Sequence, residues 1–131
     1  MRYRLTLVAF ILISHLTACL KEPGTGGTST ITGKIYAYDY DSEMNNLRTQ
    51  YYAPDEDVFI IYGEDSIYSD RTKTSYDGSY RFEYLRPGSY TIFAYSKNVI
   101  TKLPPLVAVK EKVQIQSGDQ VLTIRDIEIN K

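Results

Sequence analysis

The chain has 131 residues, and its 15 Lys and Arg against 16 Asp and Glu give a formal net charge of −1. This balance argues against a nucleic-acid partner, which favours a basic surface that neutralises several phosphates. One Cys and one His exclude a disulfide framework and any site built from several Cys and His ligands. The hydrophobic share of 43% and the charged share of 24% are typical of a globular chain, and the 13 tyrosines favour β structure.

The first 18 residues have the layout of a secretory signal. Arg2 and Arg4 precede an apolar run over residues 5–13, which is too short to span a bilayer core that takes roughly 20 apolar residues. The signal ends in a four-residue motif: Leu16, Thr17, Ala18 and Cys19. This motif resembles the lipobox of bacterial lipoproteins. The resemblance implies a helical signal peptide, residues 1–18, that is cleaved before Cys19, and acyl chains on Cys19 that anchor the mature chain in a membrane.

The same resemblance implies a location in the bacterial cell envelope. Leu20 stands where many lipoproteins of the inner membrane carry Asp, so we expect the outer membrane, on its periplasmic or its surface face. Residues 19–29 are polar and rich in Gly and Thr, which predicts a flexible tether behind the lipidated Cys. Loss of Arg2 and Arg4 would change the net charge from −1 to −3, and loss of His15 would leave the mature chain without histidine.

From residue 30 the chain reads as short strands separated by turn residues, without a sustained helical period. Residues 30–39 alternate between apolar and polar side chains and predict a half-buried strand. Residues 40–56 are rich in Asp, Asn and Pro and predict a long loop. Residues 58–62 are apolar on both faces and predict a central strand, whereas residues 66–75 predict a polar strand at a sheet edge.

Two turn motifs divide the next segment. Asp77-Gly78 lies between alternating residues and predicts a β-hairpin turn, because both positions tolerate a positive φ. Pro87-Gly88 predicts a second tight turn. Between the two turns, Tyr80, Phe82 and Tyr84 share one parity and are expected to face the core together.

These motifs resemble a known family. Residues 74–92 contain Thr, then Asp-Gly, then aromatic residues two positions apart, then Leu-x-Pro-Gly-x-Tyr-x-Ile. This order is similar to that of carboxypeptidase regulatory-like domains, also called prealbumin-like or transthyretin-like and related to collagen-adhesin B-type domains. Residues 31–35 match the opening strand of the family, and residues 112–129 fit its closing strands, with a β-bulge expected near residues 125–126. The resemblance covers residues 30–131. It implies an all-β, two-sheet sandwich of about seven strands, antiparallel or mixed.

Catalytic motifs are missing from the sequence. A mature chain without histidine excludes Ser-His-Asp and Cys-His arrangements. The Ser-x-x-Lys dyad, the Gly-x-Ser-x-Gly elbow and the phosphate-binding Gly-x-x-x-x-Gly-Lys loop are also absent from the printed sequence. We therefore expect a protein that is not an enzyme and binds no cofactor.

Two acidic loops carry oxygen ligands of the kind that calcium prefers. Asp39 and Asp41 follow the first predicted strand, and Asp55 and Asp57 precede the second. Met44 stands where a calcium loop of the EF type needs glycine. The sequence therefore predicts solvated loop charges and no metal site, with these four carboxylates as the calcium candidates.

Four aromatic side chains have outward parity: Tyr36, Tyr38, Phe93 and Tyr95. As a ligand face they would stack on sugars, but the sequence favours cross-strand pairing that stabilises the sheet, with the 40–56 loop able to lie across it. The expected function is that of a non-catalytic, lipid-anchored envelope protein serving as a structural or binding module, whose partner is an envelope protein or a glycan. The alternative is a glycan-binding surface lipoprotein. The third hypothesis is an adhesin or assembly subunit that uses residues 66–75 for strand addition.

Overall fold

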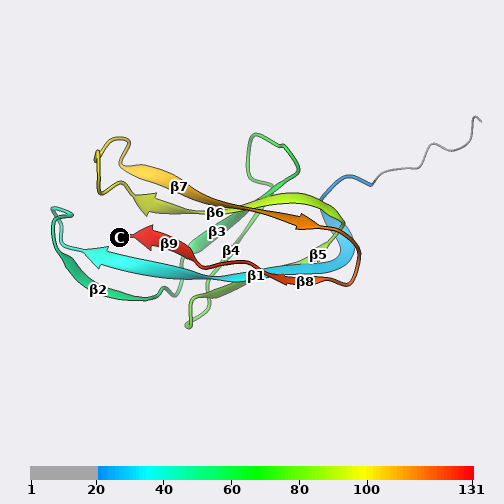
Figure 1. Cartoon of the computed structure of the whole chain (residues 1–131), viewed down its shortest axis with the longest axis horizontal. Coiled ribbons are helices and arrows are strands. Elements are labelled where there is room, and N and C mark those ends of the chain that lie inside the picture. The colour runs from blue at the N-terminus through cyan, green and yellow to red at the C-terminus, as the bar shows by residue number, and fades with distance from the viewer. Residues whose placement is uncertain (1–20) are drawn as a thin grey trace, which may run out of the picture.

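A computed structural model describes residues 21–131, which form nine strands in two sheets (Figure 1). The sheets have five and four strands and pack as a sandwich, which confirms the predicted all-β fold. The signal peptide and Cys19 lie outside the described residues. Within residues 21–131 no helix is long and apolar enough to cross a membrane.

The first sheet is organised around β1 (Thr25–Tyr40). On one side of this strand, β5 (Ser79–Leu85) pairs antiparallel with its first half and β2 (Leu47–Tyr52) with its second half. On the other side, β8 (Val121–Thr123) and β9 (Ile127–Asn130) run parallel to it. The predicted mixed sheet is thus confirmed, and β1 is hydrogen-bonded to four other strands.

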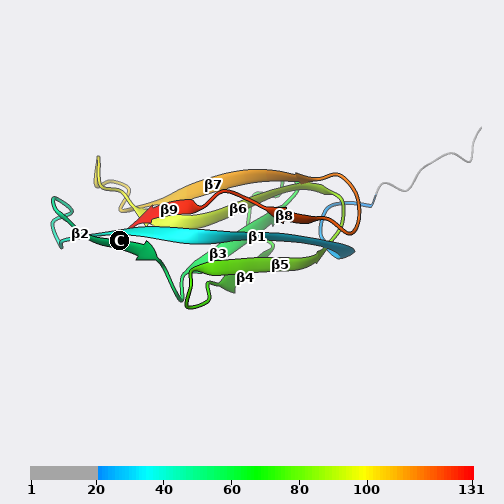
Figure 2. The same cartoon turned by 60° about the horizontal axis from the view of Figure 1, so that its bottom comes forward.

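The second sheet contains β3 (Asp57–Tyr62), β4 (Asp70–Lys73), β6 (Gly88–Lys97) and β7 (Leu106–Ile115). Its strands are antiparallel in the order β4-β3-β6-β7. The predicted central strand is confirmed as β3, and the predicted edge strand is confirmed as β4 in a shorter form. Figure 2 shows β7 and β6 above β1, and these three strands run along the long axis of the molecule.

The core lies between the two sheets, and alternate residues of the strands supply it. The inward residues of β1 and β6 are those that the sequence predicted. The buried apolar side chains are Ile31, Ile35, Ala37, Ala53, Val58, Ile60, Tyr80, Phe82, Leu85, Tyr90, Ile92, Ala94, Ile115, Ile127 and Ile129. Each large aliphatic or aromatic member contributes about 1.5–3 kcal/mol when it leaves water. The break between β8 and β9 falls at residues 124–126, where the change of parity predicted an irregularity, and it returns Ile127 and Ile129 to the core.

The ordered domain begins earlier than the sequence predicted. Residues 25–29, expected in the tether, belong to β1, and Ser29 is fully buried. The Gly24 N–H donates to Tyr90 Oη at 2.8 Å, and Ser29 Oγ donates to the carbonyl of Ser117 at 3.0 Å. At Gly27 a Cβ would lie 2.1 Å from the Leu85 carbonyl oxygen, so glycine there serves the close approach of β1 to β5, and not tether flexibility.

The predicted long loop at residues 40–56 contains β2. Tyr52 lies directly opposite Tyr36 of β1, and Tyr51 lies opposite Ala37 and packs against the core. The sequence does not predict β2, because five of its six residues are exposed and the strand has no alternating apolar face. Tyr51 is its one partly buried residue. Aromatic cross-strand contact with β1 stabilises it.

The turn at Asp77-Gly78 is tight, but it does not form the predicted hairpin. Gly78 has a φ of +76°, and the Asp77 carboxylate accepts hydrogen bonds from the Ser79 N–H at 3.1 Å and from Ser79 Oγ at 2.6 Å. These bonds hold the pKa of Asp77 below its usual value, and Lys34 lowers it further. The turn connects β4 of the second sheet with β5 of the first, and Pro87-Gly88 returns the chain from β5 to β6. Both turns therefore cross between the sheets.

Tyr84 does not face the core with Tyr80 and Phe82, as the alternation predicted. Its φ is +58° and its side chain is 70% exposed, while Leu85 is buried in its place. The positive φ interrupts the alternation of β5 next to an irregularity in the β1–β5 pairing, where Leu85 faces both Thr25 and Ser29.

We predict that Tyr90→Phe lowers the free energy of unfolding by about 1–3 kcal/mol, because it leaves buried backbone groups unsatisfied. Tyr90 Oη accepts from the Gly24 N–H and donates to the Arg86 carbonyl at 2.6 Å. Chemical denaturation measures the change. Tyr62→Phe is the matched control, because the Tyr62 ring packs 5.8 Å from that of Tyr90 and its hydroxyl makes no hydrogen bond within residues 21–131. Equal stability of the two variants would contradict the role of the Tyr90 hydroxyl.

Candidate functional site

The four aromatic residues predicted to form one face lie on two sheets. Tyr36 and Tyr38 project from the outer face of β1, whereas Phe93 and Tyr95 project from the outer face of β6. The two sheets pack through their inner faces, so these outer faces point in opposite directions. The single platform is therefore not formed, and the molecule has two separate aromatic clusters.

The aromatic cluster of the first sheet consists of Tyr36, Tyr38 and Tyr52. The Tyr36 ring meets those of Tyr38 and Tyr52 edge to face, at 5.4 and 5.1 Å between centroids. Tyr52 Oη donates to Asp126 Oδ2 at 3.0 Å, which raises the pKa of Tyr52, and Lys34 Nζ lies 4.6 Å from its ring centroid. These contacts link β1 with β2 and with the segment before β9. The cluster has the geometry of the cross-strand pairing that the sequence favours for these residues.

The aromatic cluster of the second sheet has a buried floor and exposed walls. Phe59 of β3 and Phe93 of β6 stack at 5.0 Å with an interplanar angle of 16°, and they are only 8% and 5% exposed. The Tyr95 ring stands edge-on to both at 5.6 Å, and Tyr68 from the β3–β4 connection lies 4.9 Å from Phe59. Tyr68 and Tyr95 are each 49% exposed. Two half-exposed tyrosines therefore flank a closed phenylalanine floor.

A groove of about 550 Å³ lies at this cluster. Its lining residues are Ile61, Ser66, Ile67, Tyr68, Phe93, Tyr95, Ala108 and Lys110. Ile67 is 76% exposed, so an apolar rim adjoins the rings. Phe59 is not among the predicted ligand residues, because the apolar run of residues 58–62 predicts a strand buried on both faces. Tyr68 is not among them either, because the sequence predicts an edge strand over residues 66–75, whereas Tyr68 belongs to the loop before β4.

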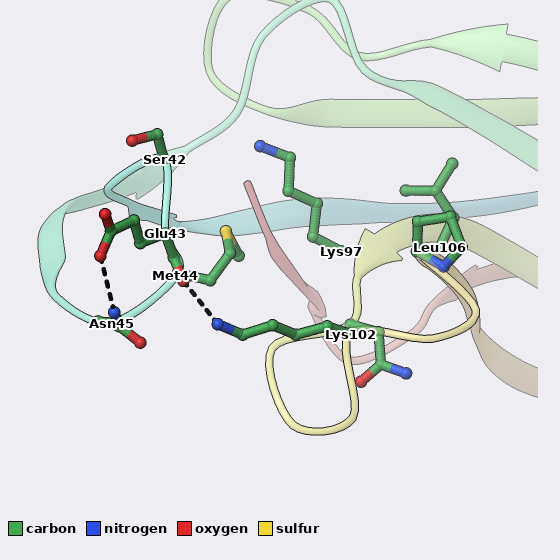
Figure 3. A pocket seen from close by; sticks show the side chains of 9 residues that line it. Ser42, Glu43, Met44, Asn45, Lys97, Lys102 and Leu106 are labelled. Carbon is green, nitrogen blue, oxygen red and sulfur yellow. Dashed lines mark hydrogen bonds between the residues drawn. The ribbon is translucent and has the colours of Figure 1, made fainter.

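A second cavity, of about 500 Å³, lies between the β1–β2 and β6–β7 loops (Figure 3). Lys102 Nζ reaches across to donate to the Glu43 carbonyl at 2.9 Å, and Asn45 Nδ2 donates to Glu43 Oε2 at 3.3 Å. Lys97 and Leu106 line the opposite wall. No aromatic ring lines this cavity, and its Lys102 ammonium is used to hold the two loops together. We therefore place the candidate site at the groove of the second sheet.

Three of the four acidic residues considered for calcium have hydrogen-bond or ion-pair partners within the protein. The Asp41 carboxylate accepts from the Asn45 N–H at 2.8 Å and from Asn46 Nδ2 at 2.7 Å, and these bonds lower its pKa. Asp55 and Asp57 lie 3.1 and 3.9 Å from Lys73 Nζ, and Asp39 faces Thr49 across the β1–β2 pair. The described part of the chain contains no group of three or more acidic, Cys or His side chains that could hold a metal ion.

We predict that Phe93→Ala lowers the free energy of unfolding by about 3–5 kcal/mol, because Phe93 is buried in the floor of the groove. Thermal and urea unfolding measure the loss. Tyr84→Ala, at a residue that is 70% exposed on β5, is the control and should stay within about 0.5 kcal/mol of the parent. A Phe93→Ala protein as stable as the parent would show that the floor is not packed as described.

The comparisons with known proteins support the fold. No family model matches the chain. Among solved structures, the fold is similar to that of a protein from Pseudomonas aeruginosa described as a "putative carbohydrate binding protein", with a TM-score of 0.50 and 13% sequence identity. The match covers 82% of this chain and 91% of that protein. This likeness shows a shared β-sandwich fold, while membership of the carboxypeptidase regulatory-like family stays a prediction.

Proposed function

We propose that this chain is a non-catalytic, lipid-anchored protein of the bacterial cell envelope whose β-sandwich binds glycans on the outer face of its second sheet. The observation that carries the proposal is the groove lined by Tyr68, Tyr95 and Phe93, whose ring stacks on that of Phe59. Aromatic rings offer flat apolar faces, and the tyrosine hydroxyls offer polar tips. A sugar ring, with C–H faces and hydroxyl edges, matches both.

Exposure supports a binding role for this cluster over a purely structural one. Tyr68, Tyr95 and Ile67 are between 49% and 76% exposed and adjoin one another around the groove. A contiguous apolar patch of this kind usually marks an interaction site. The groove volume lies within the range of small-ligand sites, roughly 300–1,000 Å³. The similar fold of a protein described as carbohydrate-binding adds support from outside the chain.

The membrane anchor in this proposal is Cys19, which the lipobox resemblance identifies. Residues 20–23 separate Cys19 from Gly24, which is hydrogen-bonded to Tyr90. Five residue steps span at most about 18 Å, so the anchor would hold the domain close to the membrane surface. The described chain enters the sandwich at one end, whereas the β1–β2 and β6–β7 loops lie at the opposite end (Figure 1). That far end would point away from the membrane.

We predict that Tyr95→Ala and Tyr68→Ala each weaken glycan binding by about tenfold, because each removes an aromatic wall of the groove. Binding of the mature protein in detergent to a glycan array identifies the ligand, and titration with that ligand gives the affinities. Tyr84→Ala and Tyr76→Ala are matched controls at residues that are 70% and 91% exposed and outside the groove lining. The proposal would be refuted if the parent protein bound no glycan. It would also be refuted if Tyr95→Ala and Tyr68→Ala bound the glycan with the affinity of the parent.

We predict that Cys19→Ala moves the protein out of the membrane fraction, because no acyl chain can then be attached at this position. Fractionation and labelling with a fatty-acid analogue in the native bacterium measure anchoring. Lys21→Ala keeps Cys19 and is the control for a change near the cleavage site. A Cys19→Ala protein that still fractionates with membranes would disprove the anchor.

A further inference from the structure

Basic side chains share the outer face of the second sheet with the aromatic groove. In the β6–β7 pair, Phe93 lies directly opposite Lys110, and Thr91 lies opposite Lys112. In the β3–β4 pair, Phe59 lies opposite Arg71. Residues directly opposite each other project to the same side of a sheet. The stacked phenylalanines are therefore flanked by a cation on each edge strand of the sheet.

A further cation stands on the same face at the end of β6. Lys97 follows Phe93 and Tyr95 in the alternation and lies opposite Leu106 of β7. Lys97, Lys110, Lys112 and Arg71 are all exposed. Lys110 also lines the groove itself. The outer face of this sheet thus carries four exposed cations, of which Lys110 lines the groove and Lys97 lines the cavity at the loop end.

These four cations are not neutralised by the protein. Within residues 21–131, none of their charged side-chain nitrogens has a carboxylate oxygen within 4.0 Å. Asp57 of β3 is the acidic residue that projects from the outer face of this sheet. It pairs with Lys73 Nζ at 3.9 Å and not with any of the four cations. On the first sheet, by contrast, Lys34 is paired with Asp77 and Arg81 with Glu83. A chain with a net charge of −1 therefore concentrates unpaired positive charge beside its aromatic groove.

We propose that the glycan bound at this groove is acidic, a polysaccharide bearing carboxylate or sulfate groups such as a uronic acid polymer. This inference rests on the proposed function. The rings would contact the apolar face of a sugar, while Lys110 meets an acidic group of that sugar or its neighbour. Hydrogen bonds between ammonium and carboxylate or sulfate are stronger than those between neutral groups, and Arg71 adds a planar donor on the opposite side.

A sugar polymer fits the groove better than single-stranded nucleic acid, which also uses aromatic and basic residues. Nucleic-acid sites stack successive bases on exposed rings. In this cluster only Tyr68 and Tyr95 are exposed, because Phe59 and Phe93 are at least 92% buried. Poly-dT is therefore included in the test as the competing polyanion.

The test compares four polymers on the mature protein in detergent: polygalacturonate, its fully methyl-esterified form, poly-L-glutamate and poly-dT. We expect polygalacturonate to bind at least about tenfold more tightly than the ester, and added salt to weaken it, because salt screens exposed charges. Lys110→Gln should lower polygalacturonate affinity by about tenfold and bring it close to that of the ester. Arg48→Gln, which removes an exposed cation of β2 on the first sheet, is the matched control and should have no effect.

Each result supports or overturns one of the two proposals. Equal binding of polygalacturonate and its ester would overturn the acidic specificity and leave the glycan-binding proposal intact. Binding of poly-L-glutamate or poly-dT as tight as that of polygalacturonate would overturn both, because charge alone would then explain the interaction. Binding of none of the four, together with an array that shows only neutral glycans, would overturn the acidic specificity alone. A Lys110→Gln protein with parental affinity for polygalacturonate would exclude the groove as the acidic site.

Discussion

β1 is hydrogen-bonded to every other strand of its sheet, and its register decides which side chains enter the core. One strand of 16 residues pairs with β5 and β8 along its first half and with β2 and β9 along its second half. Once Ile31, Ile35 and Ala37 face the core, the alternation places Lys34 and Tyr36 outside, and a shift of one residue would exchange the two sets. At Gly33 a Cβ would lie 2.5 Å from Tyr80 Oη, so glycine leaves the space that this large core ring occupies.

The two outer faces use the same residue types with different consequences. On the first sheet, Tyr52 is hydrogen-bonded to Asp126 and lies under Lys34, and Lys34 is also paired with Asp77. These contacts of Lys34 and Tyr52 tie strands of the first sheet together. On the second sheet, the rings pack among themselves, and no carboxylate of the described residues lies near enough to pair with Lys110. Both faces therefore contribute to stability through their rings, but Lys34 is used within the fold and Lys110 is not.

Local alternation and turn residues predict which side chains face inward and where the chain turns. They do not predict which strands pair with one another. The inward faces of β1 and β6, the buried strand β3 and the irregularity near residue 125 follow from parity alone, and the structure confirms them. Asp77-Gly78 and Pro87-Gly88 predict a reversal of the chain, but turn residues do not say which sheet the next strand joins. For that reason the sequence predicts one surface for Tyr36 and Phe93, which are both outward by parity, whereas they lie on different sheets. The pairing of Phe93 with Lys110 emerges only from the register of β6 and β7.

The positive charges of the second sheet also protect its edge strands from pairing with other chains. This role does not explain why they share one sign. β4 and β7 are its edge strands, and exposed edges invite pairing with other chains. Charge on β4 and the inward Glu111 of β7, which is paired with Arg125 at 2.5 Å, oppose such pairing and make strand addition at these edges less favourable. Edge protection, however, would tolerate charges of either sign. The outward cations beside the rings, Arg71 on β4 and Lys110 and Lys112 on β7, are all positive and have no ion-pair partner among the residues that the structure describes. An acidic ligand explains this shared sign, and edge protection does not.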